Sequence, residues 1–261
     1  MTRQGALSST SGQMSSVATF AEAETALHRA LRAIGEENNS EDCGRDKLWE
    51  CRGRLRGALN QQAPGVAKQS GCLPDLDALL QYELKCRGTV EATLLPCVLP
   101  GIAVWRGDIS SLKVDCIVNA ANSAMLGCFH PNHNCIDNVI HSAAGPQLRD
   151  ACADLLVETY GSLGPHVPVG GAHITTAFNL PCRYVAHTVG PSLRRGETPT
   201  AHHDALLASC YETCLTLASS ASVQAQSIAF CCISTGVFRF PQDRAARIAI
   251  DTTRAWLAAH P

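Results

Sequence analysis

A short segment in the middle of the chain combines soft metal ligands with a carboxylate. Cys128, His133 and Cys135 have the spacing Cys-x4-His-x-Cys, and Asp137 comes two residues after the last of them. Two thiolates and one imidazole suit zinc, and three protein ligands leave a fourth tetrahedral position open for water or substrate. A carboxylate beside that position could orient or deprotonate a water molecule. The spacing therefore predicts a site that does chemistry.

Each of these residues has an alternative role. His130 is a rival metal ligand two residues from Cys128, and chance proximity is a further alternative in a chain with fourteen cysteines. A purely structural zinc would need a fourth protein ligand, and this segment offers no obvious one. Asp137 could instead cap a helix that begins near Asn138, because aspartate is a favoured N-cap residue.

The composition limits the class of protein. Of the 261 residues, 46% are hydrophobic and 17% charged, and the net charge is −2. We therefore expect neither direct nucleic-acid binding nor a membrane span. The chain has many cysteines, but its first residues do not have the pattern of a secretory signal. This combination favours an intracellular protein in the cytoplasm or nucleus. Residues 1–16 are expected to be a disordered leader, with a mitochondrial transit peptide as the alternative because of Arg3 and the serines.

The chain divides into two parts by its hydrophobic pattern. Residues 17–95 are expected to form a helical N-terminal extension, with helices over 19–33, 48–59 and from 73 to 84, that packs without doing chemistry. After Pro96, strands alternate with helices, which is typical of an α/β sandwich with a largely parallel or mixed sheet. Strands are expected at 102–105, 116–118, 172–178, 184–188 and 228–233, and helices at 141–156, 203–217 and 243–257.

Three of the expected strand ends carry polar sequence: residues 106–109, 119–122 and 234–238. Ligands of open α/β sheets bind beyond the carboxyl ends of strands, and loops of small residues offer backbone N–H groups to phosphate. No lysine or arginine lies between Lys113 and Arg149, so backbone amides would have to neutralise a phosphate ester. The motifs of P-loop proteins, Rossmann dinucleotide sites, metalloproteases and α/β-hydrolases do not occur.

Several longer motifs resemble the macrodomain family, and within it the MacroD-type hydrolases of protein-linked ADP-ribose. The resemblance spans about residues 100–260. Its motifs, in colinear order, are Gly107–Ile109, Ile117–Asn122, Asp137 with Ile140–Pro146, Ala172–Thr175, Tyr184–Pro191 and Ile233–Phe238. One departure is that Gly127–Cys135 replaces the usual glycine-rich run, which is similar to a zinc-containing branch of the family that also has a helical N-terminal extension.

The resemblance implies a fold and a role for each matched residue. The fold would be a three-layer α/β/α macrodomain over residues 96–261, with a mixed, largely parallel central sheet. Asn122 and Asp137 would be catalytic, holding the distal ribose and placing the attacking water. The substrate-binding residues would be Asp108 and Ile109 at adenine, Asn119, the diphosphate-binding Ser234, Thr235, Gly236 and Val237, and Phe238 against the distal ribose; zinc would be held by Cys128, His133 and Cys135.

Simpler roles remain open for several of these residues. Asn122 and Asp108 could be turn residues. Phe238 could fill the core. His141 and His187 lie in apolar sequence and are expected to be buried histidines with satisfied hydrogen bonds.

The implied function is removal of mono-ADP-ribose from modified proteins, with deacetylation of O-acetyl-ADP-ribose as a side activity. The expected partners are ADP-ribose and mono-ADP-ribosylated proteins, and the expected state is a monomer. One alternative is a reader that binds ADP-ribose without cleaving it. Another is a zinc-dependent interaction protein with no nucleotide ligand.

Overall fold

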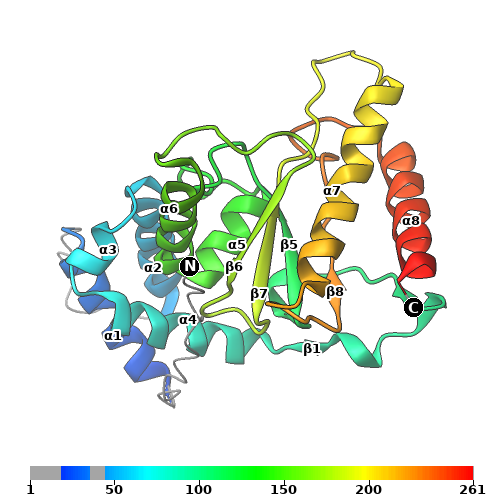
Figure 1. The fold of residues 1–261 in the computed structure, drawn as a ribbon. Helices are drawn as coiled ribbons and strands as arrows, with labels where there is room; N and C mark the ends of the chain where they lie inside the picture. The colour runs from blue at the N-terminus through cyan, green and yellow to red at the C-terminus, as the bar shows by residue number, and fades with distance from the viewer. Residues whose placement is uncertain (1–18, 36–44, 261) are drawn as a thin grey trace, which may run out of the picture.

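The computed structural model describes residues 19–35 and 45–260, with side chains described from residue 50 in the second range. The expected leader over residues 1–16 lies outside the described residues. Figure 1 shows a central sheet with helices on both faces and a further group of helices beside one of those layers.

The N-terminal helices form a layer with its own apolar core. Helix α1 begins after a capping box in which Thr19 and Glu22 satisfy each other's backbone N–H groups. Leu27 and Leu31 of α1 pack with Leu55 of α2 and Leu76 of α4, and all four are fully or almost fully buried. Three of the helices were expected and the short α3 was not. Their bounds are α1 Phe20–Ala33, α2 Arg45–Gln61, α3 Val66–Gln69 and α4 Leu73–Arg87.

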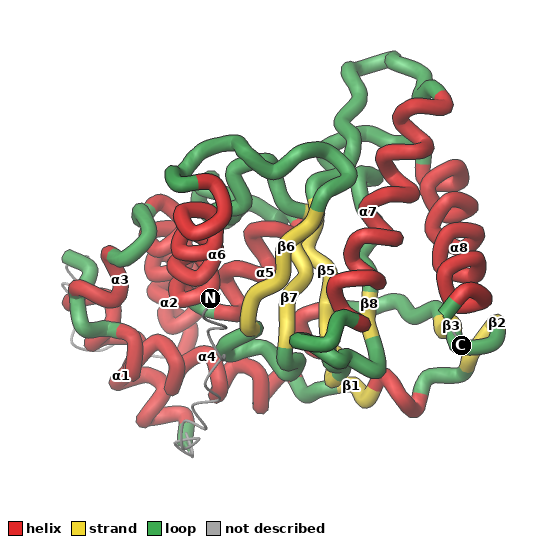
Figure 2. Tube along the Cα trace, in the orientation of Figure 1, coloured by secondary structure: helices red, strands yellow, loops and turns green. Residues whose placement is uncertain are grey.

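A segment of short elements connects these helices to the central sheet. Strands β1 and β4 pair in parallel, whereas β2 and β3 form a small antiparallel pair that lies beside the C-terminus in Figure 2. The elements are β1 Val90–Glu91, η1 Ala92–Leu94, β2 Cys97–Leu99, β3 Ile102–Ala103, η2 Ile109–Ser111 and β4 Leu112–Lys113.

The central sheet has the strand order β6-β7-β5-β8. Strand β5 (Cys116–Ala120) pairs in parallel with β7 (Tyr184–Thr188) and with β8 (Ile228–Ala229), while β6 (Ala172–Thr176) runs antiparallel to β7. The expected mixed, largely parallel sheet is confirmed. Strand β8 ends four residues earlier than expected, because the chain turns into the loop that precedes the last helix.

Both faces of this sheet are covered, as the apolar sequence of β5 predicts. Successive side chains of a strand point to opposite faces. Cys116 and Val118 of β5 accordingly pack toward helices α7 (Ala201–Ser219) and α8 (Gln242–Ala259), and Ile117 packs toward α5 (Ile136–Ala144) and α6 (Pro146–Tyr160). Figure 1 shows the two helix pairs on opposite sides of the sheet, so the three-layer arrangement is confirmed.

The single helix expected over residues 141–156 is wrong, because the chain forms two helices there. Gly145 ends α5 with a φ of 95°, a backbone conformation that side chains rarely adopt. Pro146 then starts α6 at its first position, where the missing N–H costs no intrahelical bond.

The geometry of the sheet places several loops at one edge. Because β5, β7 and β8 are parallel, the loops that follow them lie at the same edge, which is the upper one in Figure 2. These loops carry most of the residues singled out above. Within the described residues, no helix combines the length and apolar character needed to cross a bilayer.

Candidate active site

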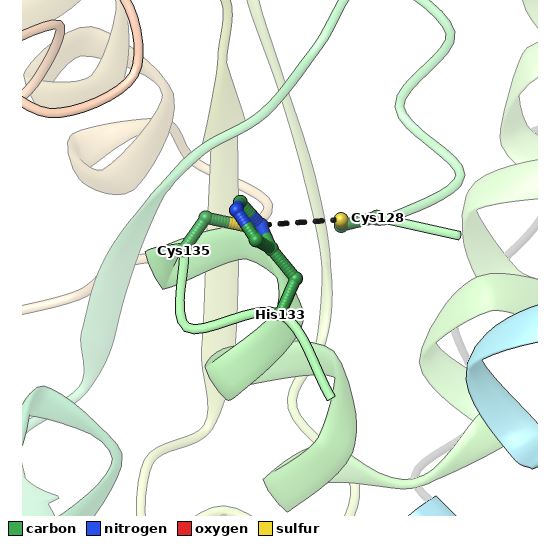
Figure 3. Close-up of side chains that lie close together, drawn as sticks. All are labelled: Cys128, His133 and Cys135. Carbon is green, nitrogen blue, oxygen red and sulfur yellow. Dashed lines mark hydrogen bonds between the residues drawn. The ribbon is translucent and has the colours of Figure 1, made fainter. Parts of the chain in front are cut away.

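The loop of residues 127–135, here called the ligand loop, brings the three expected metal ligands together between β5 and α5. Figure 3 shows the His133 ring beside the sulfur of Cys135, with Cys128 facing them from the other side. The ligand atoms of all three lie within 4.8 Å of one another, and Cys128 Sγ is 3.7 Å from His133 Nδ1. Cys135 is also the N-cap of α5, where its Sγ accepts a hydrogen bond from the backbone N–H of Asn138.

This arrangement fits a tetrahedral zinc ion. Zinc bound to sulfur at about 2.3 Å and to nitrogen at about 2.05 Å would separate those two ligand atoms by about 3.6 Å. Within the described residues no fourth histidine, cysteine or acidic side chain joins the group, as expected for a site with an open position. The rival ligand His130 is exposed and is not a member of the group.

Asp137 lies in the first turn of α5 with its carboxyl group buried. It is not the helix cap, because Cys135 occupies that position. Its Oδ1 accepts a hydrogen bond from Asn119 Nδ2 at 2.8 Å. Burial raises the pKa of Asp137 to about 6, and the bond from Asn119 acts against that rise. The sequence placed Asn119 among substrate-binding residues, but its amide is here engaged with Asp137.

Two buried histidines lie next to the pair of Asp137 and Asn119. His187 is satisfied, since Asn119 and Thr175 lie within hydrogen-bond distance of its two ring nitrogens. Neither ring nitrogen of His141 has a hydrogen-bond partner in the described chain, and Nε2 lies 3.5 Å from Asp137 Oδ1. The expectation of a satisfied core histidine thus holds for His187 and is wrong for His141.

His141 and His187 form a second group of candidate metal ligands with buried Cys152. Burial lowers the pKa of both imidazoles and raises that of the thiol, so all three are neutral at pH 7. Both ring nitrogens of His187 already have partners, and the positive charge of Arg149 acts on His141 and Cys152. A cation is therefore better accommodated at the ligand loop.

Asn122 is a turn residue at the end of β5. Its Oδ1 accepts hydrogen bonds from the backbone N–H groups of Ala124 and Met125, and its Nδ2 donates to the carbonyl of Gly127. One of the two Nδ2 hydrogens is left for a ligand. These hydrogen bonds show that Asn122 has the turn role. A bond from its side-chain amide to a ribose would have to use the remaining hydrogen.

Asp108 caps the short helix η2, which agrees with the alternative that it is a turn residue. Its Oδ1 accepts from the backbone N–H and the hydroxyl of Ser110, and its Oδ2 pairs with Arg87 of α4 at 3.0 Å. A carboxylate has about four acceptor positions. Three are used by these donors, so Asp108 retains room for one further donor. Ile109, the next residue, is buried.

The loop of residues 234–238 follows β8, with Gly236 and Val237 exposed. Ser234 has a φ of 64°, and its buried hydroxyl has no hydrogen-bond partner in the described chain. The backbone N–H groups of residues 236–238 donate to no acceptor in the described part of the chain. Consecutive free N–H groups form a concave donor site for anions. Thr235 donates its hydroxyl to Cys232 O, Val237 is 60% exposed, and Phe238 is half-buried.

One buried cation of this region, Arg149, was not predicted from the sequence. Arg149 of α6 donates to the carbonyls of Leu126, Leu59 and Gln62, and its guanidinium stacks 4.3 Å from the ring centroid of Phe129. It thereby ties α6 to the ligand loop and to α2. The one available signal was that Arg149 is the first lysine or arginine after Lys113.

Comparison with known proteins identifies the family. The Macro domain family model matches residues 118–249. A protein from Treponema medium named protein-ADP-ribose hydrolase is 57% identical over 208 residues, covering 78% of this chain and 76% of the relative. A Staphylococcus aureus (strain MRSA252) protein of the same name is 46% identical over 215 residues, covering 81% and 76%.

A solved structure is similar to this one over most of its length. The macrodomain of Trypanosoma brucei, in complex with ADP-ribose, is 31% identical and has a TM-score of 0.55. The similarity covers 78% of this chain and 84% of the trypanosomal one. The fold, the colinear motifs and these relatives together establish that the chain belongs to the macrodomain family.

Proposed function

We propose that this protein hydrolyses the bond between mono-ADP-ribose and a protein side chain. The observation that carries the proposal is the position of Asp137. Its buried carboxyl group accepts a hydrogen bond from Asn119, and Asp137 follows Cys135, the last of the three converging ligands, by two residues. The names of the Treponema and Staphylococcus relatives support the same activity.

The substrate would lie along the loops that follow β5 and β8. We assign the free N–H groups of Gly236, Val237 and Phe238, with the unpartnered Ser234 hydroxyl and the adjoining Thr235, to the diphosphate. Asp108 would accept from the adenine amino group beside Ile109. Asn122 and Phe238 would contact the distal ribose. A diphosphate bound by amides needs no lysine, which agrees with the absence of lysine and arginine between Lys113 and Arg149.

Cys128, His133 and Cys135 would hold zinc. A bound metal would supply a Lewis acid to the reaction. Asp137 Oδ1 is occupied by Asn119, whereas Oδ2 accepts no hydrogen bond from the described residues. We assign Oδ2 to the proton of the attacking water. The water oxygen forms a bond to C1″ of the ribose, the bond from C1″ to the side-chain oxygen breaks, and the proton passes to that oxygen.

The experiment is a single-turnover demodification assay on a mono-ADP-ribosylated protein. Asp137→Ala and Cys135→Ala should each lose at least about 100-fold in rate, the scale of a general base or metal ligand. Asp154→Ala is the matched control, because Asp154 is exposed on α6. Full turnover by both site variants would refute the scheme. Tight ADP-ribose binding without turnover by the wild type would instead identify a reader.

Two finer proposals concern a side activity and the compartment. O-acetyl-ADP-ribose presents the same ligand and an ester near the same water, so we propose its deacetylation as a side activity. We also propose that the protein acts in a reducing compartment inside the cell. All thirteen cysteines that the structure describes are free thiols, which supports this.

A further inference from the structure

Asn138, at the third position of α5, contacts the ligand loop at several points. Its backbone N–H donates to Cys135 Sγ, and its Nδ2 donates to the carbonyl oxygens of Cys128 and His130 at 3.4 and 3.0 Å. The side chain is completely buried. One residue therefore connects the two ends of the loop, where two of the three candidate ligands lie.

Arg56, on helix α2 of the N-terminal layer, holds Asn138 in turn. Its Nη2 donates to Asn138 Oδ1 at 2.8 Å and to the carbonyl of His133 at 3.3 Å, and its Nε donates to the Ser142 hydroxyl at 3.1 Å. The remaining candidate ligand, His133, is thus tied to the same network. The planar guanidinium suits this task, since it offers several donors in a fixed geometry.

A second contact from α2 holds the middle of the loop. Asn60 is buried, and its Oδ1 accepts from the backbone N–H of Asn132 at 3.1 Å. Asn132 has a left-handed φ of 53° and donates its Nδ2 to the carbonyl of Gly53. A methyl group on Gly57 would lie only 3.0 Å from Asn132 Nδ2.

These residues lie on one face of α2. Residues 53, 56, 57 and 60 have the i, i+3, i+4 and i+7 spacing that shares a helix face. The face combines the side chains of Arg56 and Asn60, which bond to the loop, with the Gly53 carbonyl, which accepts from Asn132, and with Gly57, whose missing side chain lets the loop approach. Plain packing of an accessory helix would not require this combination.

We propose that helix α2 is the outer shell of the metal site, with Arg56 and Asn60 as positioning residues that hold the ligand loop ready to bind metal. The inference rests on the metal site of the proposed function. Three ligands within eight residues converge only when the loop backbone is fixed, including the left-handed Asn132. Outer partners of metal ligands typically change metal affinity by about 10- to 100-fold.

The test measures zinc affinity of the full-length protein by competition with a chromogenic chelator. Arg56→Ala should raise the zinc Kd by about 10- to 100-fold. Arg56→Lys should recover only part of the lost affinity, because an ammonium group cannot reproduce the fixed arrangement of donors on a guanidinium. Arg52→Ala is the matched control. Arg52 lies one helical turn away and pairs with Glu83 of α4, not with the ligand loop.

A second variant avoids the risk that Arg56→Ala fails to fold. Asn132 is exposed, and glycine accepts its left-handed φ, so Asn132→Gly removes only the side-chain bond to Gly53. We expect a zinc Kd raised several-fold. The absorption spectrum of cobalt-substituted protein gives an independent readout, because its band shape follows coordination geometry. Arg56→Ala should change that spectrum and Arg52→Ala should not.

The outcomes separate this inference from the proposed function. If the wild type binds zinc and Arg56→Ala and Asn132→Gly bind it equally well, with unchanged cobalt spectra, the positioning role of α2 is refuted and the metal site stands. If the wild type binds no zinc in the micromolar range, both the metal site and the role of α2 are refuted. Neither measurement requires substrate.

Discussion

Gly190 and Ser234 come from different loops and touch. A methyl group on Gly190 would lie 2.1 Å from the Ser234 hydroxyl oxygen, far inside van der Waals contact. Gly190 follows β7 and Ser234 lies in the loop after β8, so the absence of one side chain lets the two loops meet at the sheet edge.

Gly190→Ala should therefore weaken ADP-ribose binding by displacing residues 234–238. We expect a Kd at least about 10-fold higher by calorimetry and a loss of about 1–3 kcal/mol in unfolding free energy, as in overpacked cores. Gly53→Ala is the control, because its methyl group would meet nothing within 4 Å. Unchanged affinity in Gly190→Ala would show that this loop does not bind the ligand.

The side chain of Asp108 offers a test of base recognition. One acceptor position remains after its bonds to Ser110 and Arg87. If it receives the adenine amino group, wild-type protein should prefer ADP-ribose over inosine diphosphate ribose, which has a carbonyl there, by roughly 10-fold. Asp108→Ala should abolish that preference.

Arg87→Ala provides the control for this measurement. It removes the exposed ion pair and keeps the carboxylate, so the preference for adenine should persist while stability changes by less than about 1 kcal/mol. A preference that survives Asp108→Ala would assign base recognition to other residues.

Arg149 should be one of the most sensitive positions for stability. Its buried guanidinium donates hydrogen bonds to the carbonyls of Leu126, Leu59 and Gln62. These bonds connect helix α6 to two other parts of the chain. Arg149→Ala would leave the carbonyls of Leu126 and Gln62 without a donor from the described residues, and we expect a loss of about 3–5 kcal/mol in urea unfolding. Arg247→Ala, at an exposed position of α8, should change stability by less than about 0.5 kcal/mol. A loss below about 1 kcal/mol for Arg149→Ala would mean that water replaces the guanidinium.

The sequence predicts the local part of this site better than the long-range part. Cys128, His133 and Cys135 lie within eight residues, so only a turn is needed to bring them together. The layers of the fold follow likewise from apolar strands that alternate with amphipathic helices. The break at Gly145 escaped prediction because the hydrophobic pattern continues across it from α5 into α6.

The residues that support the site could not be predicted in the same way. Arg56 reaches Asn138 across 82 positions of sequence, and Arg149 reaches Leu59 across 90. Such contacts depend on how one helical layer docks on another, which no local pattern encodes. Asn119 stands out in the sequence because it is a polar residue at the end of an apolar strand. Its hydrogen bond to Asp137 could not be predicted, because that bond depends on where α5 lies.

The buried histidines make stability depend on pH. Burial lowers the pKa of His187 from 6.5 to about 3. Between those values the unfolded chain binds a proton on His187 and the folded protein does not, so folding stability falls as the pH falls below 6.5. His141 acts in the same direction, whereas Asp137, whose pKa is raised by burial, acts in the opposite one.

Comparison with a variant isolates the contribution of His187. The amide introduced by His187→Gln could still bond Asn119 or Thr175 but would bind no proton. From about pH 7.5 to about 5.0 the wild type should lose about 2 kcal/mol more unfolding free energy than this variant, measured in urea with chelator present so that metal binding does not contribute. His202→Gln, at an exposed position of α7, should follow the wild-type curve. Parallel curves for the wild type and His187→Gln would mean that His187 takes up its proton in the folded protein as readily as in the unfolded chain.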